Sequence, residues 1–77
     1  MLEERKKKYI HGSTLGELRG CVEDALRGFG SEAADREADL IVELCTGLDR
    51  LAAFLGRDSE ASAEAVRRAE EVLARRA

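Results

Sequence analysis

Proline and tryptophan are absent from this 77-residue sequence, and its only aromatic residues are Tyr9, Phe29 and Phe54. Aromatic residues favour strands, so their scarcity argues against a β-sandwich. No run of about 18 apolar residues is present to span a bilayer, and no apolar stretch follows the N-terminus as it does in a signal peptide. We therefore expect a cytoplasmic protein that does not enter a membrane.

Cysteine and histidine are also scarce. Cys21, Cys45 and His11 lie in three separate segments, whereas a structural zinc site needs four ligands and usually has closely spaced pairs. The two cysteines are expected to be reduced and to act as small apolar core residues. His11 lies in a short polar connector with no group to orient it as a base. The sequence therefore predicts no catalytic residue, no cofactor or metal, and no enzyme activity.

The residues that are abundant favour helices. Hydrophobic residues make up 44% of the chain and charged residues 38%, and 12 of the hydrophobic residues are alanine. This composition is typical of an all-α protein. At this length there is room for a single domain, and the supply of large apolar side chains is modest for a monomer. The preference for arginine and alanine is common in products of GC-rich genomes and hints at a bacterial or phage origin.

Breaker residues and apolar periodicity divide this single domain into an arm and three helices. The predicted segments are a basic arm or short helix over residues 1–13, and helices over residues 14–29, 32–55 and 59–76. The connection between the first two helices is short, so we expect them to form an antiparallel hairpin. With the third C-terminal helix they predict either a three-helix bundle or a dimeric helical bundle.

Several residues mark where these helices begin and end. Thr14 followed three residues later by Glu17 predicts a capping box at the first helix. Ser31 is predicted to cap the second helix, and Gly56 to end it. Asp58 or Ser59 is predicted to cap the third helix. Because the apolar residues of the third helix are mostly small, we expect it to pack at the periphery.

Apolar residues form stripes on the first two helices. In the first helix the stripe consists of Leu15, Leu18, Val22, Ala25 or Leu26, and Phe29. In the second, alternating a and d heptad positions are occupied by Ile41, Leu44, Leu48, Leu51 and Leu55. Its flanking positions are apolar as well, so the apolar arc covers about half of the helix and is wider than one partner helix requires.

The C-terminal end of the predicted central helix extends beyond the start of the first helix. It needs cover from Tyr9 and Ile10, from the third helix, or from a second chain. We therefore predict a protein interface on this helix, used by a homodimer, by another protein, or by both. The predicted interface residues are Leu40, Leu44, Leu48, Leu51, Phe54 and Leu55.

Glycine recurs at every fourth position over Gly12, Gly16 and Gly20. A glycine inside a helix costs about 1 kcal/mol relative to alanine, which suggests a compensating gain. Gly16 and Gly20 could form a groove in which another backbone approaches closely. The alternative is that both glycines are tolerated on an exposed face.

Four adjacent basic residues, Arg5, Lys6, Lys7 and Lys8, precede Tyr9 and could contact phosphate groups. The rest of the chain argues against nucleic acid, because residues 11–77 hold nine basic and 14 acidic residues. The leading hypothesis is a small protein-interaction module or regulator, of the adaptor, chaperone, antitoxin or inhibitor type. The alternative is a nucleic-acid-associated regulator that uses the basic arm, with the bundle as its dimerisation domain.

Overall fold

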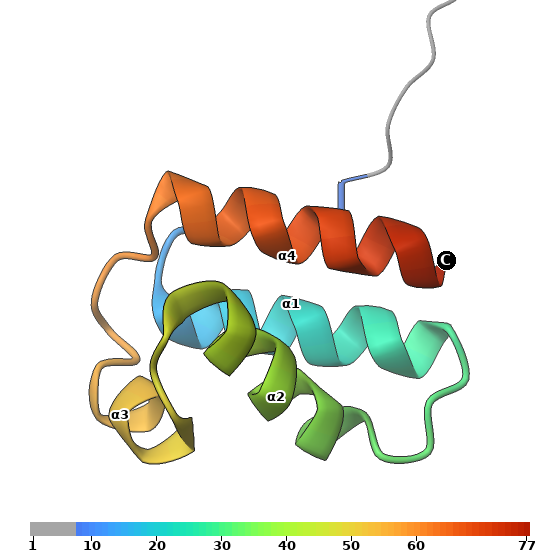
Figure 1. The fold of residues 1–77 in the computed structure, drawn as a ribbon, viewed down its shortest axis with the longest axis horizontal. Coiled ribbons are helices and arrows are strands. Elements are labelled where there is room, and N and C mark those ends of the chain that lie inside the picture. The colour runs from blue at the N-terminus through green and yellow to red at the C-terminus, as the bar shows by residue number, and fades with distance from the viewer. Residues whose placement is uncertain (1–7) are drawn as a thin grey trace, which may run out of the picture.

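A computed structural model describes residues 8–77, and within that range the chain forms four α-helices and no β-strand (Figure 1). The helices are α1 (Leu15–Gly28), α2 (Ala34–Thr46), α3 (Arg50–Leu55) and α4 (Ala63–Arg76). The predicted all-α class is therefore confirmed. Over the same residues, no helix has the length and apolar character needed to cross a membrane.

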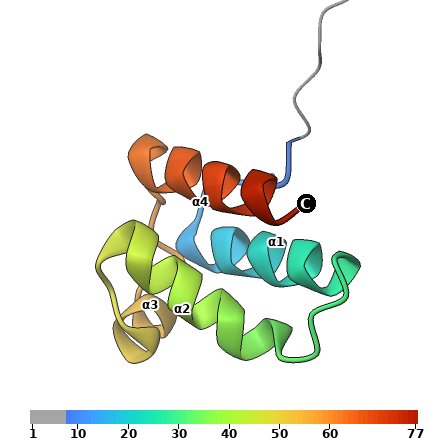
Figure 2. The ribbon, with the colours of Figure 1, turned by 45° about the vertical axis from the view of Figure 1, so that its right-hand side comes forward.

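Three of the helices form a bundle. α1 and α4 lie side by side and run in the same direction, and α2 runs back across them (Figures 1 and 2). The short helix α3 lies at the end of the bundle where α1 begins, and it contacts α1 and α2. The architecture is thus a three-helix bundle with a short helix inserted before its last member.

The core lies between α1, α2 and α4. Val22, Leu26 and Leu73 are completely buried at its centre. The contiguous core cluster consists of Ile10, Leu15, Leu18, Val22, Leu26, Ala34, Ala38, Ile41, Cys45, Ala61, Ala65, Ala69 and Leu73, and Val42 is buried in addition. No polar or charged residue is buried among residues 8–77. The stripe predicted on the first helix is confirmed except at Phe29, which ends α1 and packs edge-on against Tyr9 outside the core.

The start of α1 confirms the predicted capping box. The Glu17 N–H donates to Thr14 Oγ1 at 3.1 Å, and the Thr14 N–H donates to Glu17 Oε1 at 3.0 Å. The next two amide groups of α1 are satisfied from the loop between α3 and α4. Leu15 N–H donates to the Ser59 carbonyl and Gly16 N–H to the Arg57 carbonyl. The first turn of α1 is therefore completed by residues more than 40 positions away.

The predicted single helix over residues 32–55 is wrong, because the chain breaks it into α2 and α3. Gly47 adopts a left-handed conformation with φ 79°, and its N–H donates to the Glu43 carbonyl at 2.8 Å. Glycine pays no steric penalty for this conformation, so α2 ends there. Asp49 Oδ1 then accepts from the Ala52 N–H at 2.9 Å and starts α3. The heptad seam therefore does not continue beyond residue 46.

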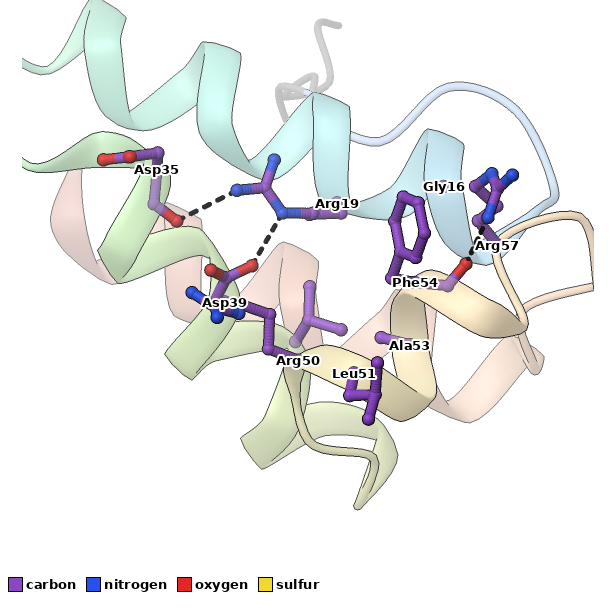
Figure 3. A pocket seen from close by; sticks show the side chains of 10 residues that line it. Gly16, Arg19, Asp35, Asp39, Arg50, Leu51, Ala53, Phe54 and Arg57 are labelled. Carbon is purple, nitrogen blue, oxygen red and sulfur yellow. Dashed lines mark hydrogen bonds and ion pairs between the residues drawn. The ribbon is translucent and has the colours of Figure 1, made fainter.

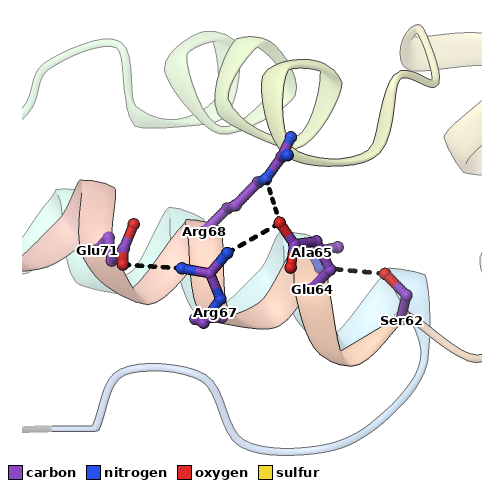
Figure 4. Close-up of polar contacts among 6 residues, drawn as sticks. All are labelled: Ser62, Glu64, Ala65, Arg67, Arg68 and Glu71. Carbon is purple, nitrogen blue, oxygen red and sulfur yellow. Dashed lines mark hydrogen bonds and ion pairs between the residues drawn. The ribbon is translucent and has the colours of Figure 1, made fainter.

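Two predicted caps are also wrong. Ser31 does not cap α2, which starts after Ala33 with no side-chain cap; its hydroxyl instead donates to Glu37 Oε1 at 2.6 Å. Neither Asp58 nor Ser59 caps α4, whose cap is Ser62, with the hydroxyl accepting from the Ala65 N–H (Figure 4). The predicted end of the helix at Gly56 is confirmed as the end of α3.

α4 lies against the core and not at the periphery, which corrects the expectation from its small residues. Ala65, Ala69 and Leu73 are buried, and the small alanines let its backbone approach the neighbouring helices closely. Its exposed side carries ion pairs. Glu64 accepts from both Arg67 and Arg68, which lowers the pKa of its carboxyl group (Figure 4). The Glu64–Arg68 pair has an N–O distance of 2.9 Å.

Candidate functional site

Five of the six predicted interface residues are exposed. We call Leu40, Leu44, Leu51, Phe54 and Leu55 the apolar set; their side chains are 58–73% exposed. The sixth, Leu48, lies in the α2–α3 connection, where it is half-buried and packs against the core. Among residues 8–77, α4 does not cover α3, because the only helices that α3 contacts are α1 and α2. Ile10 is part of the core.

The apolar set faces two directions. Leu40 and Leu44 lie one turn apart on α2, away from the face that carries the buried Ala38, Ile41 and Cys45. Leu51 and Phe54, by contrast, line a cleft of about 660 Å³ between α1, α2 and α3 (Figure 3). The cleft is lined by Gly16, Arg19, Asp35, Asp39, Val42, Arg50, Leu51, Ala53, Phe54 and Arg57. The break at Gly47 creates this cleft, since it separates the α3 side chains from the line of α2.

Arg19 joins α1 to α2 along one wall of the cleft. Its Nε donates to Asp39 Oδ1 at 2.7 Å and its Nη2 to the Asp35 carbonyl at 3.1 Å (Figure 3). Its Nη1 also pairs with Glu23 at 2.6 Å. The hydrogen bond to Asp39 raises the pKa of the guanidinium group above its ordinary value. Arg19 and Asp39 therefore satisfy each other and form a structural clamp.

Arg50 and Arg57 differ from Arg19, because neither forms an ion pair within residues 8–77. Both are exposed. The guanidinium carbon of Arg57 lies 4.2 Å from the centre of the Phe54 ring, and its Nη1 donates to the Phe54 carbonyl at 2.8 Å. The cleft thus combines exposed apolar surface with two arginines that have no carboxylate partner.

The two glycines predicted for close packing have different surroundings. A Cβ atom at Gly16 would lie 3.2 Å from the Arg57 carbonyl oxygen, so the backbone that approaches this glycine belongs to the same chain. Around Gly20 nothing lies within 4 Å of such an atom. The structure therefore gives a packing reason for Gly16 and none for Gly20.

The predicted basic cluster falls mostly outside the described residues, which exclude Arg5, Lys6 and Lys7. Lys8 is exposed and lines a second cleft, of about 710 Å³, with Tyr9 and part of α4. The Tyr9 and Ile10 amide groups donate to the Glu70 carboxylate at 2.8–3.0 Å, which attaches this segment to α4.

Both cysteines are free, with Cys45 buried and Cys21 half-buried. Burial raises the pKa of the Cys45 thiol, so it stays protonated at neutral pH. The Cys21 thiol donates to the His11 carbonyl at 3.2 Å and accepts from the His11 N–H at 3.3 Å. Within residues 8–77, no group of three or more His, Cys, Asp and Glu side chains is arranged to hold a metal ion.

Sequence reasoning missed the cleft and its two arginines that lack a carboxylate partner. It treated residues 32–55 as one helix, which placed Arg50 on a solvated polar face and left Arg57 in a connector. Two residues could have revealed the break. Gly47 is a residue type that commonly ends a helix, and Asp49 is one that commonly caps the start of the next.

The comparisons with known proteins return one family. Neither the curated proteins nor the solved structures contain a match to this chain. A family model described as the PrmC N-terminal domain matches residues 17–77, which include all of α2, α3 and α4 and most of α1. That domain is helical and comes from a methyltransferase family. The chain belongs to the PrmC N-terminal domain family.

Proposed function

We propose that this chain is a protein-interaction domain that acts through the apolar set and contributes binding rather than catalysis. The supporting observation is the exposure of five large apolar side chains on two consecutive helices. Burying one such side chain fully is worth about 1.5–3 kcal/mol, so covering several of them could sustain an association. Exposed apolar patches mark interaction sites in soluble proteins, and the apolar set contributes residues to one on α2 and to another in the cleft.

Membership of a domain family drawn from methyltransferases fits a binding role. Catalysis would then belong to another part of the proteins in which the domain occurs. The proposal covers an adaptor or regulator as well as a domain that helps an enzyme hold a protein partner.

The first partner that we propose is a second copy of this chain. Leu40 and Leu44 form an apolar strip on the side of α2 that faces away from the core. In a two-fold dimer the same strip from each copy would meet its equivalent, which needs no second binding surface. Such a contact would also add buried apolar area to a chain that is short for a monomer.

Size-exclusion chromatography with light scattering tests this proposal. We expect a species of twice the 8.4 kDa chain mass, which the Leu40→Ser/Leu44→Ser variant converts to a monomer without loss of helix content. Arg75→Ser, an exposed substitution on α4, should leave the mass unchanged. A wild-type chain that stays monomeric at the highest soluble concentration would contradict self-association.

A further inference from the structure

We propose that the cleft between α1, α2 and α3 binds an acidic amphipathic segment of another protein. Apolar side chains of that segment would contact Leu51 and Phe54, and its carboxylates would pair with Arg50 and Arg57 (Figure 3). This inference rests on the proposed role in protein binding and names the chemistry of the partner.

The apolar part of the argument rests on Phe54. Its ring is 58% exposed and lines the cleft together with Gly16, which has no side chain to fill the space, and with the buried Val42. The Arg57 guanidinium carbon lies 4.2 Å from the centre of the ring. An aromatic side chain has few rotatable bonds, so it loses little conformational freedom when a partner covers it, and such residues carry a large share of binding energy.

The charges of the cleft select the partner. Asp39 is already paired with Arg19, which also binds Glu23. The guanidinium groups of Arg50 and Arg57 therefore remain available to bind carboxylates, and arginine can bind a carboxylate through two parallel hydrogen bonds. A basic segment would face the same two groups, and among the acidic residues that line the cleft only the Asp35 carboxylate has no ion pair and could attract it.

Arg50 and Arg57 are positively charged, whereas the net charge of the described chain is negative. Residues 8–77 contain 14 acidic and ten basic residues. The net charge therefore favours a basic partner at long range, and a preference for an acidic one has to arise locally.

A second copy of the chain fits this cleft poorly. Leu51 and Phe54 are flanked by Arg50 and Arg57 in every copy. A two-fold contact through the cleft would bring like charges together near the axis, which is unfavourable in a partly dehydrated interface. The leucine strip of α2 used in the proposed dimer lies outside the cleft lining, so both interactions can occur together.

Fluorescence anisotropy with two labelled synthetic peptides tests the inference. Both peptides are helix-forming with identical leucine and phenylalanine positions; one carries glutamate and the other lysine at every polar position. We expect the acidic peptide to bind at least about tenfold more tightly, which corresponds to about 1.4 kcal/mol. Raising the salt concentration should reduce this preference.

Variants locate the site. Arg50→Glu/Arg57→Glu should reverse the order of the two peptides, and Phe54→Ser should weaken the binding of both. The matched control is Arg36→Glu/Arg75→Glu, which makes the same change in net charge at exposed positions outside the cleft lining and should retain the preference. Circular dichroism checks that each variant keeps its helix content.

Three results would overturn the inference. They are equal or tighter binding of the basic peptide, loss of the preference in the control variant, and a change of oligomeric state in the Arg50→Glu/Arg57→Glu variant, which would assign the cleft to a second copy. Suppose that neither peptide binds, but that the wild-type chain is a dimer and the Leu40→Ser/Leu44→Ser variant is a monomer. The cleft inference then fails, and the proposed function in protein binding remains. If peptides bind and no dimer forms, self-association fails alone.

Discussion

The bundle of α1, α2 and α4 and the short helix α3 use leucine in opposite ways. In the bundle, Leu18, Leu26 and Leu73 are almost wholly enclosed. In α3, none of the six residues is buried, and Leu51 and Leu55 are well exposed. A helix of this length is not stable alone in water, so its caps and its contacts with α1 and α2 maintain it.

This difference separates residues that hold the fold from residues that are available for binding. Side chains in the bundle add to the free energy of unfolding through burial. The apolar side chains of α3 contribute little to it, because water still reaches them. The proposed partner would cover them, and the following variants test that division.

The largest expected effect is from truncation in the bundle. Leu73→Ala removes a completely buried side chain and should lower the free energy of unfolding by about 2–5 kcal/mol. Leu51→Ala, at a position that is 65% exposed, should lower it by less than about 0.5 kcal/mol. Urea titration followed by far-ultraviolet circular dichroism measures both, and similar losses would show that α3 packs as firmly as the bundle.

The next effect concerns the glycine that divides α2 from α3. Gly47→Ala places a Cβ atom at φ 79° and should cost about 1–2 kcal/mol. Gly20→Ala is the matched control, because Gly20 lies in a helix with open space around it and should gain about 0.5–1 kcal/mol. If thermal unfolding shows both variants to be stabilised, the left-handed turn is not required for the break.

A smaller, local effect is expected at the start of α3. Asp49→Ala removes the acceptor for the Ala52 N–H and should cost about 1 kcal/mol of cap stability. Amide exchange at Ala53 and Gly56 should accelerate about fivefold while the bundle amides keep their rates. Asp49→Asn, which keeps an acceptor oxygen, should restore slow exchange. Equal acceleration in α4 would show that α3 and the bundle open as one unit.

The smallest effect is a pH dependence at the start of α1. The backbone N–H groups of Thr14 and Ser13 lower the pKa of the Glu17 carboxyl group from its ordinary 4.5 in the folded state. Above pH 4.5 both states are ionised and the stabilisation is complete. As the pH falls below it, the unfolded chain takes up the proton first, so the free energy of unfolding decreases. Glu17→Gln should reduce the slope of stability against pH between 4.5 and the lowered pKa, and an unchanged slope would exclude this contribution.

The sequence was sufficient to predict the helical class, the capping box at Thr14 and most of the stripe on α1, because each depends on local spacing. It also singled out five leucine and phenylalanine side chains that the structure exposes. These features follow from the period of a helix and the chemistry of its ends.

The break at Gly47 and the role of α4 were missed for physical reasons. The heptad pattern continues through Gly47, so periodicity alone cannot detect a residue whose left-handed conformation ends the helix. The alanines of α4 look unsuited to a core until the close approach of α2 makes small side chains necessary. The cleft depends on the break at Gly47, which is why Arg50 and Arg57 were not recognised from the sequence.

The start of α1 also bears on how the chain can fold during synthesis. The Leu15 and Gly16 amide groups need the carbonyl groups of Ser59 and Arg57, and the Ala61 amide group donates back to the Ser13 carbonyl. A nascent chain that has emerged only as far as α2 lacks these partners. α1 therefore completes its first turn only after the loop between α3 and α4 has left the ribosome.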